Sequence, residues 1–466
     1  MADLVAAVLV GSAKVELAAA AMGRPLMPRC MLFGDSITHY NSYDNPSAPN
    51  ETGNGLSGYF THLNWISGQR FRLAYEKGVP GNTTRQMAAR YDIDVAANYS
   101  GFDMMFLLGG TNDMIFGQAG PTVSRPRTIP KEETLANLIA MATAALAAGK
   151  AVVLIMILPR AGTGWNPITD NTGQAQLARE IRWVNQQLKL WRASLSPLVP
   201  LYLVDCDRDF VDPASGSGFG SLTVMSDGLH PNGRGAAFMA RRIWSVISPL
   251  FPSIPPFSPT DDLYDATYNP LGNLGGANVS FRTTSGGVAT RVSGTVPQNW
   301  NVSRAVNASG PPIGEVVVST VAQAAGYDAA SGNALQFVVD MAAGQGSNEV
   351  VQLQGPNIVS GFAAGDSVEL SCSLSWADAV NFSNPALILQ DFDGTANFLS
   401  SDGKVASGVG VGDITTPHPI TMKTRTRVLP AGVQRLNMLL QLAFNASASP
   451  ASGTFTLTDV QIRKVA

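Results

Sequence analysis

A proline-rich stretch divides this chain of 466 residues into two parts with different sequence patterns. Prolines recur from Pro249 to Pro259, and proline cannot continue a helix and favours an extended spacer. The chain is also too long for one ordinary hydrophobic core. We therefore expect one folded domain at residues 28–250, a linker at 251–262 and a second domain at 263–466.

Before the linker, apolar runs alternate with segments of helical periodicity, an order typical of a parallel α/β sheet. The predicted strands are Arg29 to Phe33, Phe71 to Tyr75, Met104 to Leu108, Ala151 to Leu158 and Leu201 to Val204. Helices are predicted at residues 56–66, 84–99, 130–149 and 233–247. The clearest helical spacing runs through Leu177, Ile181, Val184, Leu188 and Trp191.

After the linker, short β-type runs are separated by Gly, Ser, Asn and Asp. They cover residues 314–321, 335–341, 367–373, 436–444 and 454–463. This pattern predicts an all-β sandwich of the jelly-roll type. The closing run, Phe455 to Ile462, resembles the last strand of carbohydrate-binding jelly rolls.

Three short motifs of the first domain contain groups that could act together on an ester. Gly34-Asp35-Ser36 and Gly110-Thr111-Asn112-Asp113 each follow an apolar run, and Asp227-Gly228-Leu229-His230 lies near the end of the domain. A serine hydroxyl is a poor nucleophile until a base takes its proton, and the base needs a carboxylate to fix its tautomer. Asp227 and His230 lie three residues apart on a turn and suit that pairing. The amide of Asn112 can donate to an oxyanion.

Each motif alone also has a simpler interpretation. A Gly-Asp-Ser string is more often a polar turn, a His-Pro pair is usually a surface turn, and Asn112 could form an Asx turn. Their joint occurrence at the carboxyl ends of strands favours catalysis, because ligands bind at this edge of open α/β sheets. His39 and His62 are the nearest competing bases, and His39 fits a loop or substrate-side position better. His418 belongs to the second domain.

The same residues resemble the characteristic blocks of the SGNH (GDSL-type) hydrolases. The first block is similar to Phe33–Thr38, which makes Ser36 the implied nucleophile and its backbone N–H an oxyanion donor. The second is similar to Glu76–Thr84, where Gly81 matches the glycine whose N–H faces the oxyanion. Glu76 replaces the usual Asn, which affects a supporting hydrogen bond and no catalytic group.

The third block makes Asn112 the implied third donor, and the last makes Asp227 and His230 the remaining members of the triad. The resemblance covers about residues 28–250 and implies a flavodoxin-like three-layer α/β/α domain with a parallel five-stranded sheet. It implies acyl-enzyme chemistry that needs no cofactor. The intact triad argues against an inactive scaffold.

Several residues are weaker candidates for contacts with substrate. Asp35, His39, Asp113 and Trp165 belong to the first domain, and Trp300 and Trp376 to the second. Trp300 and Trp376, with Tyr327, Phe382 and Phe392, could stack on a saccharide ring or could fill the sandwich core. Sugar binding, trimerisation and attachment to a larger particle therefore remain alternatives for the second domain.

Charge and cysteine content exclude several function classes. The net charge is −3, only 14% of residues are charged, and no block of like charges occurs, so nucleic acid and polybasic membrane attachment lack support. The three cysteines, Cys30, Cys206 and Cys372, form neither a disulfide framework nor a metal cluster, and no metal site is expected.

Residues 1–27 contain Ala/Val-rich runs but no Lys or Arg near the start, so the positive region of a secretory signal is missing. Neither run approaches the roughly 20 apolar residues that span a bilayer. We expect a helical or anchoring segment that packs on the first domain or on a partner.

Together these features predict an extracellular or virion-surface esterase that removes O-acetyl groups from an acylated polysaccharide. The alternative is a structural or receptor-binding protein of a phage virion or cell surface, which uses the same fold on host glycan and is active or inactive. A homotrimer, or virion partners bound through residues 1–27 or the second domain, would fit this alternative.

Overall fold

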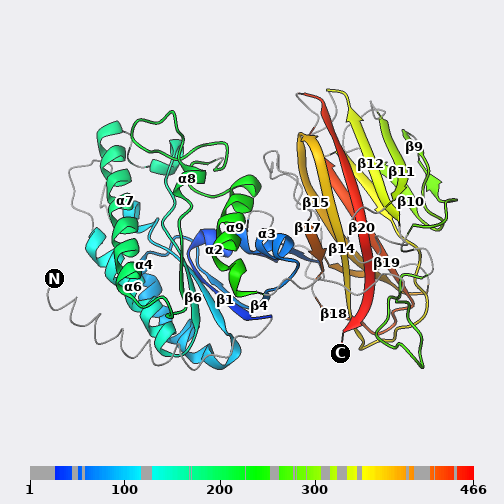
Figure 1. The fold of residues 1–466 in the computed structure, drawn as a ribbon, viewed down its shortest axis with the longest axis horizontal. Coiled ribbons are helices and arrows are strands. Elements are labelled where there is room, and N and C mark those ends of the chain that lie inside the picture. Colours follow the sequence, from blue (N-terminus) through cyan, green and yellow to red (C-terminus); the bar gives the residue numbers. More distant parts are fainter. Residues whose placement is uncertain are drawn as a thin grey trace. The chain divides into compact units, whose positions relative to one another are not determined.

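The computed structural model describes residues 27–44, 51–54, 58–116, 129–166, 168, 170–225, 227–251, 262–276, 279, 281–289, 291–305, 315–322, 333–343, 349–394, 398–402, 420–424, 426–445 and 449–465. They fall into two compact units (Figure 1). The first is drawn from Met1–Ser42, Ser57–Leu63 and Arg70–Pro252, and the second from Tyr43–Leu56, Asn64–Gln69 and Ser253–Ala466.

The first unit is built on a parallel five-stranded sheet in the order β4-β1-β5-β6-β7. Its strands are β1 (Arg29–Gly34), β4 (Arg72–Gly78), β5 (Met104–Leu108), β6 (Ala151–Ile155) and β7 (Leu201–Val204). In chain order this is 2-1-3-4-5, the flavodoxin-like arrangement. Every residue of β5 and β6 is buried, as expected for strands covered on both faces. The predicted parallel sheet is therefore confirmed.

Helices cover both faces of this sheet, with α4, α6 and α7 on one side and α9 on the other (Figure 1). The helices are α2 (Ser36–His39), α3 (Tyr59–Ser67), α4 (Thr84–Asp94), α5 (Asp113–Phe116), α6 (Lys131–Ala147), α7 (Asn171–Ser194), α8 (Asp207–Phe210) and α9 (Gly233–Ile247), with 3₁₀ turns at Ala96–Gly101, Gly162–Trp165 and Ser248–Leu250. The apolar stripe predicted for α7 is buried along its whole length. Helix α6 begins after Pro130 and ends before Gly149, whose φ is +76°.

Two elements end earlier than the sequence predicts. Helix α4 stops at Asp94 rather than Tyr99, because the Asn98 side chain donates to the Asp94 carbonyl and the chain continues as a 3₁₀ turn. Strand β6 ends at Ile155, although the apolar run to Leu158 remains buried. Apolar sequence alone does not distinguish a strand from the buried loop that follows it.

The second unit contains two large sheets. Their strands are β2 (Ser42–Asp44), β3 (Glu51–Asn54), β8 (Gly287–Val288), β9 (Val292–Gly294), β10 (Asn301–Ala305), β11 (Glu315–Ala322), β12 (Asn333–Met341), β13 (Glu349–Gln354), β14 (Ser367–Val380), β15 (Phe382–Phe392), β16 (Phe398–Asp402), β17 (Ile420–Lys423), β18 (Arg427–Val428), β19 (Arg435–Phe444) and β20 (Ala451–Val465). One sheet runs β2-β3-β16-β15-β19-β13-β10-β8 and the other β17-β14-β20-β12-β11-β9, with β18 beside β14. This β-rich unit is consistent with the predicted second domain, and its jelly-roll topology stays a prediction.

Residues of both sheets share one hydrophobic core. Trp300 and Trp376 belong to it, with only 1% and 5% of their surface exposed. Their rings therefore fill the core and present no face on which a sugar could stack, which corrects the expectation for both residues. Phe382 is fully buried there as well, and Tyr327 and His418 lie outside the described residues.

Two segments of the predicted first domain group with the β-rich unit. Strand β3, in the expected polar loop after Ser36, pairs in parallel with β16. Trp65, in the last turns of α3, is 4% exposed within the β-rich core, and Gln69 donates to the Thr421 carbonyl at 2.7 Å. The sequence pattern does not indicate that these two segments belong to the β-rich unit, because both lie far from the linker.

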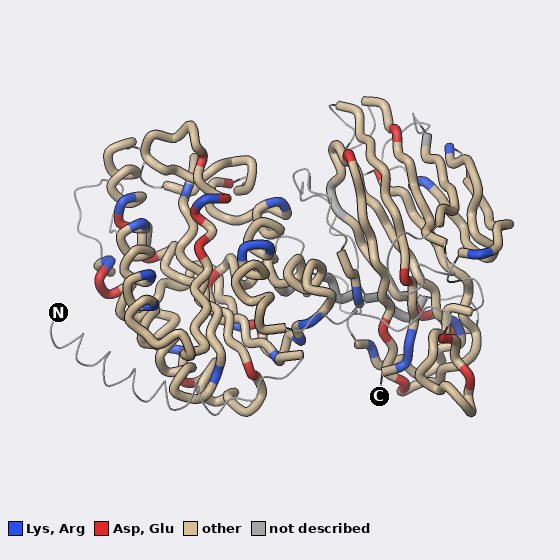
Figure 2. Tube along the Cα trace, viewed as in Figure 1, with Lys and Arg blue, Asp and Glu red and all other residues tan. Residues whose placement is uncertain are grey.

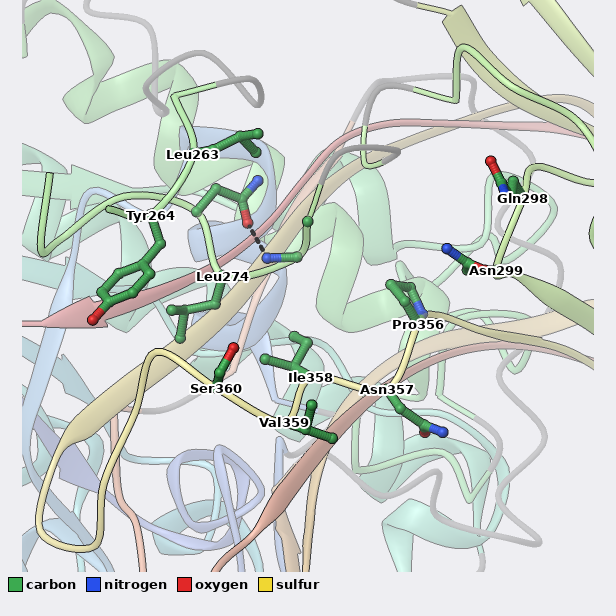
Figure 3. Close-up of a pocket in the computed structure, with 13 residues that line it drawn as sticks. Leu263, Tyr264, Leu274, Gln298, Asn299, Pro356, Asn357, Ile358, Val359 and Ser360 are labelled. Carbon is green, nitrogen blue, oxygen red and sulfur yellow. Dashed lines mark hydrogen bonds between the residues drawn. The ribbon is translucent and has the colours of Figure 1, made fainter. Parts of the chain in front are cut away.

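A groove of about 370 Å³ opens on the β-rich unit (Figure 3). Leu274 and Ile358 are its buried apolar residues, and Asn299 and Asn357 are exposed along it. In Figure 3, Tyr264 lies on the opposite side from Asn299. None of the lining residues is charged, so the groove suits a neutral ligand with both apolar and hydrogen-bonding groups.

Charges of both signs are interspersed over the described parts of both units (Figure 2). Within those residues, no helix is long and apolar enough to cross a membrane. No cluster of three or more His, Cys, Asp or Glu that could hold a metal occurs among them either. Except for Met27, Phe251 and Asp262, the predicted N-terminal segment and linker lie outside the described residues.

Candidate active site

The turn between β1 and α2 presents Ser36. Strand β1 ends at Gly34, and Asp35 caps α2 by accepting a hydrogen bond from the Ile37 N–H at 3.0 Å. A Cβ on Gly34 would lie 2.1 Å from Thr38 Oγ1 and 2.4 Å from the Leu108 carbonyl oxygen. Only glycine therefore fits at this position, and the tight turn places Ser36 at the carboxyl end of β1, an interior strand of the sheet.

Ser36, His230 and Asp227 form a continuous hydrogen-bonded chain. Ser36 Oγ lies 2.9 Å from His230 Nε2, and His230 Nδ1 lies 2.6 Å from Asp227 Oδ2. The other carboxylate oxygen of Asp227 accepts the backbone N–H groups of Leu229 and His230, at 2.9 and 2.7 Å. This is the order of nucleophile, base and orienting carboxylate that the motifs predict.

The environment of Asp227 keeps its carboxyl group ionised. Partial burial opposes the charge, but the His230 ring and the two backbone N–H groups outweigh it and lower the pKa of Asp227. An ionised Asp227 can orient the His230 ring with Nε2 toward Ser36 and can stabilise the imidazolium that forms. The edge-on ring of Tyr40, centred 5.0 Å away, also contacts His230.

Two of the three predicted oxyanion donors, Gly81 and Asn112, lie on loops that a hydrogen bond connects. Gly81 adopts φ +77°, a conformation that glycine accepts without strain. The next residue, Asn82, accepts a hydrogen bond through its carbonyl from Asn112 Nδ2 at 3.0 Å. This bond uses one of the two amide protons of Asn112, and the second remains for an oxyanion.

A buried carboxyl group and a buried guanidinium lie close to the triad. Burial raises the pKa of Asp35 to about 7, against the hydrogen bond from Ile37 and the attraction of Arg160. Burial also lowers the pKa of Arg160 to about 10, against the attraction of Asp35 and Asp227. Both side chains are at most 2% exposed.

The weaker candidates separate into buried and exposed residues. Asp113 is fully buried and accepts hydrogen bonds from the Thr84 N–H at 2.7 Å and the Thr134 hydroxyl at 2.8 Å, so it anchors the first turns of α4 and α6 rather than facing a ligand. Asp35 caps α2 from within the fold, and Trp165 is 1% exposed in the α/β core. Burial thus removes all three as direct substrate contacts.

His39 is the exposed candidate, with 48% of its side chain accessible and its Nδ1 3.9 Å from Glu76 Oε2. Glu76 Oε1 accepts the Gly78 N–H at 2.6 Å, so this unusual residue of the second block stabilises the end of β4. His62 is 4% exposed. The hydrogen-bonded base of Ser36 is His230.

Sequence reasoning missed two neighbours of the triad. Arg160 follows the buried run that begins with β6, and a charged residue directly after such a run is a recognisable sign of an active-site edge. Tyr40 has no comparable sign, because its contact with His230 joins residues far apart in sequence.

Residues 32–238 match a family model described as GDSL-like Lipase/Acylhydrolase family. A comparison with curated proteins gives no match. A putative acylhydrolase from Bacteroides fragilis is 22% identical, covers 50% of this chain and 93% of its own, and has a TM-score of 0.35. A GDSL-like lipase from Bacteroides thetaiotaomicron is 20% identical, covers 52% of this chain and 98% of its own, and has a TM-score of 0.34. An acetylxylan esterase from Geobacillus stearothermophilus is 20% identical, covers 47% of this chain and 94% of its own, and has a TM-score of 0.34.

The family match spans all four motifs, from the strand before Ser36 to the helix after His230. The α/β unit is therefore similar to the GDSL-like lipases and acylhydrolases. The match ends before the β-rich unit.

Proposed function

We propose that this protein is a serine esterase that removes short acyl groups, O-acetyl above all, from a polysaccharide. The observation that carries the proposal is the hydrogen-bonded chain from Ser36 through His230 to Asp227. The similarity of residues 32–238 to the GDSL-like lipases and acylhydrolases supports the reaction class. The choice of substrate rests on the polar loop after Ser36 and on the β-rich unit, and nothing at residues 40–55 reads as the apolar lid of a lipase.

In the first half of the proposed reaction, His230 Nε2 takes the Ser36 proton as Oγ attacks the ester carbonyl. The carbonyl oxygen becomes an oxyanion, which the Asn112 amide and the backbone N–H groups of Ser36 and Gly81 stabilise. Removing one such donor typically lowers turnover about 10²- to 10³-fold. His230 then gives its proton to the departing sugar oxygen, and the acyl group remains on Ser36.

In the second half, His230 takes a proton from water, and the resulting nucleophile attacks the acyl-enzyme. The same donors stabilise the second oxyanion, and His230 returns the proton to Ser36 Oγ as the acid leaves. Asp227 keeps the imidazole in one orientation through both halves. The net reaction consumes one ester and one water and needs no metal or cofactor.

The acylated polysaccharide would be a partner for both units. We propose that the neutral groove along Asn299 and Asn357 holds part of the glycan, since amide groups pair with sugar hydroxyls. Asn357→Ala should then raise the KM for an acetylated polymer severalfold while leaving hydrolysis of p-nitrophenyl acetate unchanged. Equal KM values for variant and wild type on the polymer would contradict glycan binding in this groove. Oligomerisation would then be the alternative role of the β-rich unit.

The experiment that tests the proposed function measures acetate release from p-nitrophenyl acetate and from a panel of acetylated polysaccharides. We expect release by the wild-type protein and none above background by Ser36→Ala. Background rates for both proteins on every ester would contradict an esterase.

The alternative function, a phage or cell-surface receptor-binding protein, gains no support from the comparisons. An extracellular or virion-surface location and a trimeric state remain proposals of their own. Gel filtration with light scattering tests the second, because a stable monomer would contradict the trimer.

A further inference from the structure

Arg160, which follows the buried run of β6, lies behind the active-site loops with 2% of its surface exposed. Its Nε donates to Thr111 Oγ1 at 3.2 Å, and its Nη2 donates to the Thr111 carbonyl at 2.7 Å. Its Nη1 donates to the Gly164 carbonyl. Two guanidinium nitrogens therefore bind Thr111, which directly precedes Asn112, and the third binds the segment that contains Gly164.

The other segment, Ala161–Gly164, lies against the loop that carries the base. The Ala161 N–H donates to the Gly228 carbonyl at 2.8 Å, and the Thr163 hydroxyl donates to the Asp227 carbonyl at 2.9 Å. A Cβ on Gly164 would lie 2.2 Å from the Gly228 carbonyl oxygen. The backbones of this segment and of the Asp227–His230 loop are thus packed as closely as glycine allows.

We propose that Arg160 is a positioning residue, which fixes the Asn112 donor relative to the Asp227–His230 loop. The proposal rests on the proposed esterase function. A planar guanidinium has donors in a fixed fork, so it can hold two segments at a defined distance, which the flexible ammonium of lysine cannot do equally well. Its burial is tolerated because its nitrogens have hydrogen-bond partners.

The first test replaces Arg160 with Gln and Arg192 with Gln as a matched control. Arg192 also donates to backbone carbonyls, those of Leu201 and Ser196. For p-nitrophenyl acetate, we expect R160Q to lower kcat about 10- to 100-fold, since small misplacements of catalytic groups have effects of this size. KM should stay within about threefold, and R160K should recover part of the loss.

A double-mutant cycle with Asn112→Ala separates positioning from general damage. If Arg160 acts through the Asn112 donor, R160Q should cost much less in the N112A background than in the wild type. A loss by R160Q of the same factor in both backgrounds would overturn the proposal. So would equal kcat values for R160Q and R192Q.

One further variant and one structural measurement cover the other outcomes. If R160Q does not fold, Thr163→Val removes only the exposed contact with Asp227 and should still lower kcat severalfold, and an unchanged kcat would contradict the proposal. If the wild type hydrolyses no ester, the proposed function fails by itself. Crystal structures of wild type and R160Q then decide the positioning claim, which requires a shift of Asn112 relative to Gly228.

Discussion

At the scale of single residues, the site combines an exposed acid–base pair with buried charged neighbours. His230 and Asp227 retain 22% and 54% of their side-chain surface, so substrate and water can reach the base. Asp35 and Arg160 lie behind them without access to solvent. The base of the proposed reaction is thus accessible, whereas Asp35 and Arg160 bind backbone groups of the turns around it.

Replacing Asp227 with Asn tests the role of the carboxylate. An amide can no longer fix the His230 tautomer by accepting its Nδ1 proton, so kcat on p-nitrophenyl acetate should fall by roughly 10³- to 10⁴-fold with little change in KM. Asp212→Asn is the matched control, because the Asp212 side chain caps a turn away from the triad, and it should keep full activity. A D227N variant within tenfold of wild type would rule out this role.

Asp35 should make the stability of the protein depend on pH. Its folded-state pKa, about 7, lies above the ordinary 3.8, so between these values the folded protein binds more protons than the unfolded chain. Stability should therefore fall as pH rises through this window. Asp35→Asn keeps an oxygen that can cap Ile37 but does not titrate, and it should show a flatter dependence.

Urea unfolding of wild type and D35N at pH 5 and pH 8 measures this effect. We expect the difference in unfolding free energy to change by about 2–3 kcal/mol in favour of D35N at the higher pH, since one pKa unit corresponds to about 1.4 kcal/mol. Parallel pH profiles for the two proteins would contradict a raised folded-state pKa of Asp35.

At the scale of elements, the predicted strands and helices of the α/β unit agree well with the structure because long apolar runs and helical spacing specify them. Five strands and the buried stripe of α7 follow from these patterns. Ser36 was recognisable because its motif directly follows β1, and Asp227 and His230 because they lie three residues apart before a helix. The pairing of β3 with β16 was not, because a short strand with a polar sequence carries no periodic pattern.

The turn from β1 to α2 gives an element-scale prediction. Gly34→Ala would force a methyl group onto Thr38 and the Leu108 carbonyl, so β1 and β5 would have to separate at the site. We expect a loss of several kcal/mol in stability together with a sharp drop in kcat. Gly149→Ala is the control: its Cβ would meet nothing within 4 Å, and only the positive φ costs about 1–2 kcal/mol. Equal stabilities and activities for the two variants, measured by urea unfolding and ester hydrolysis, would contradict this account.

At the scale of the whole molecule, the two units are not consecutive pieces of chain. The β-rich unit includes residues 43–56 and 64–69, which interrupt the α/β unit shortly after Ser36. A chain truncated after Pro252 would lack β16 and the core around Trp65. Cutting the chain at its linker therefore removes partners of segments that precede the linker.

Replacing Trp65 tests how much the segment at residues 64–69 contributes to the stability of the β-rich unit. Trp65→Ala should destabilise the full-length protein by about 3–5 kcal/mol, the usual cost of emptying a buried tryptophan site. Tyr268→Ala, at a residue 90% exposed in the same unit, should change stability by less than about 0.5 kcal/mol. Thermal unfolding of both variants gives the comparison, and a W65A protein as stable as Y268A would show that the core tolerates the loss.

The most direct test of the triad is covalent labelling of the intact protein with a fluorophosphonate, followed by peptide mapping. The account predicts one label, on Ser36, that forms rapidly in the wild type and is nearly abolished by His230→Ala. Labelling at another serine, or equal labelling of Ser36 in the two proteins, would contradict an activated Ser36.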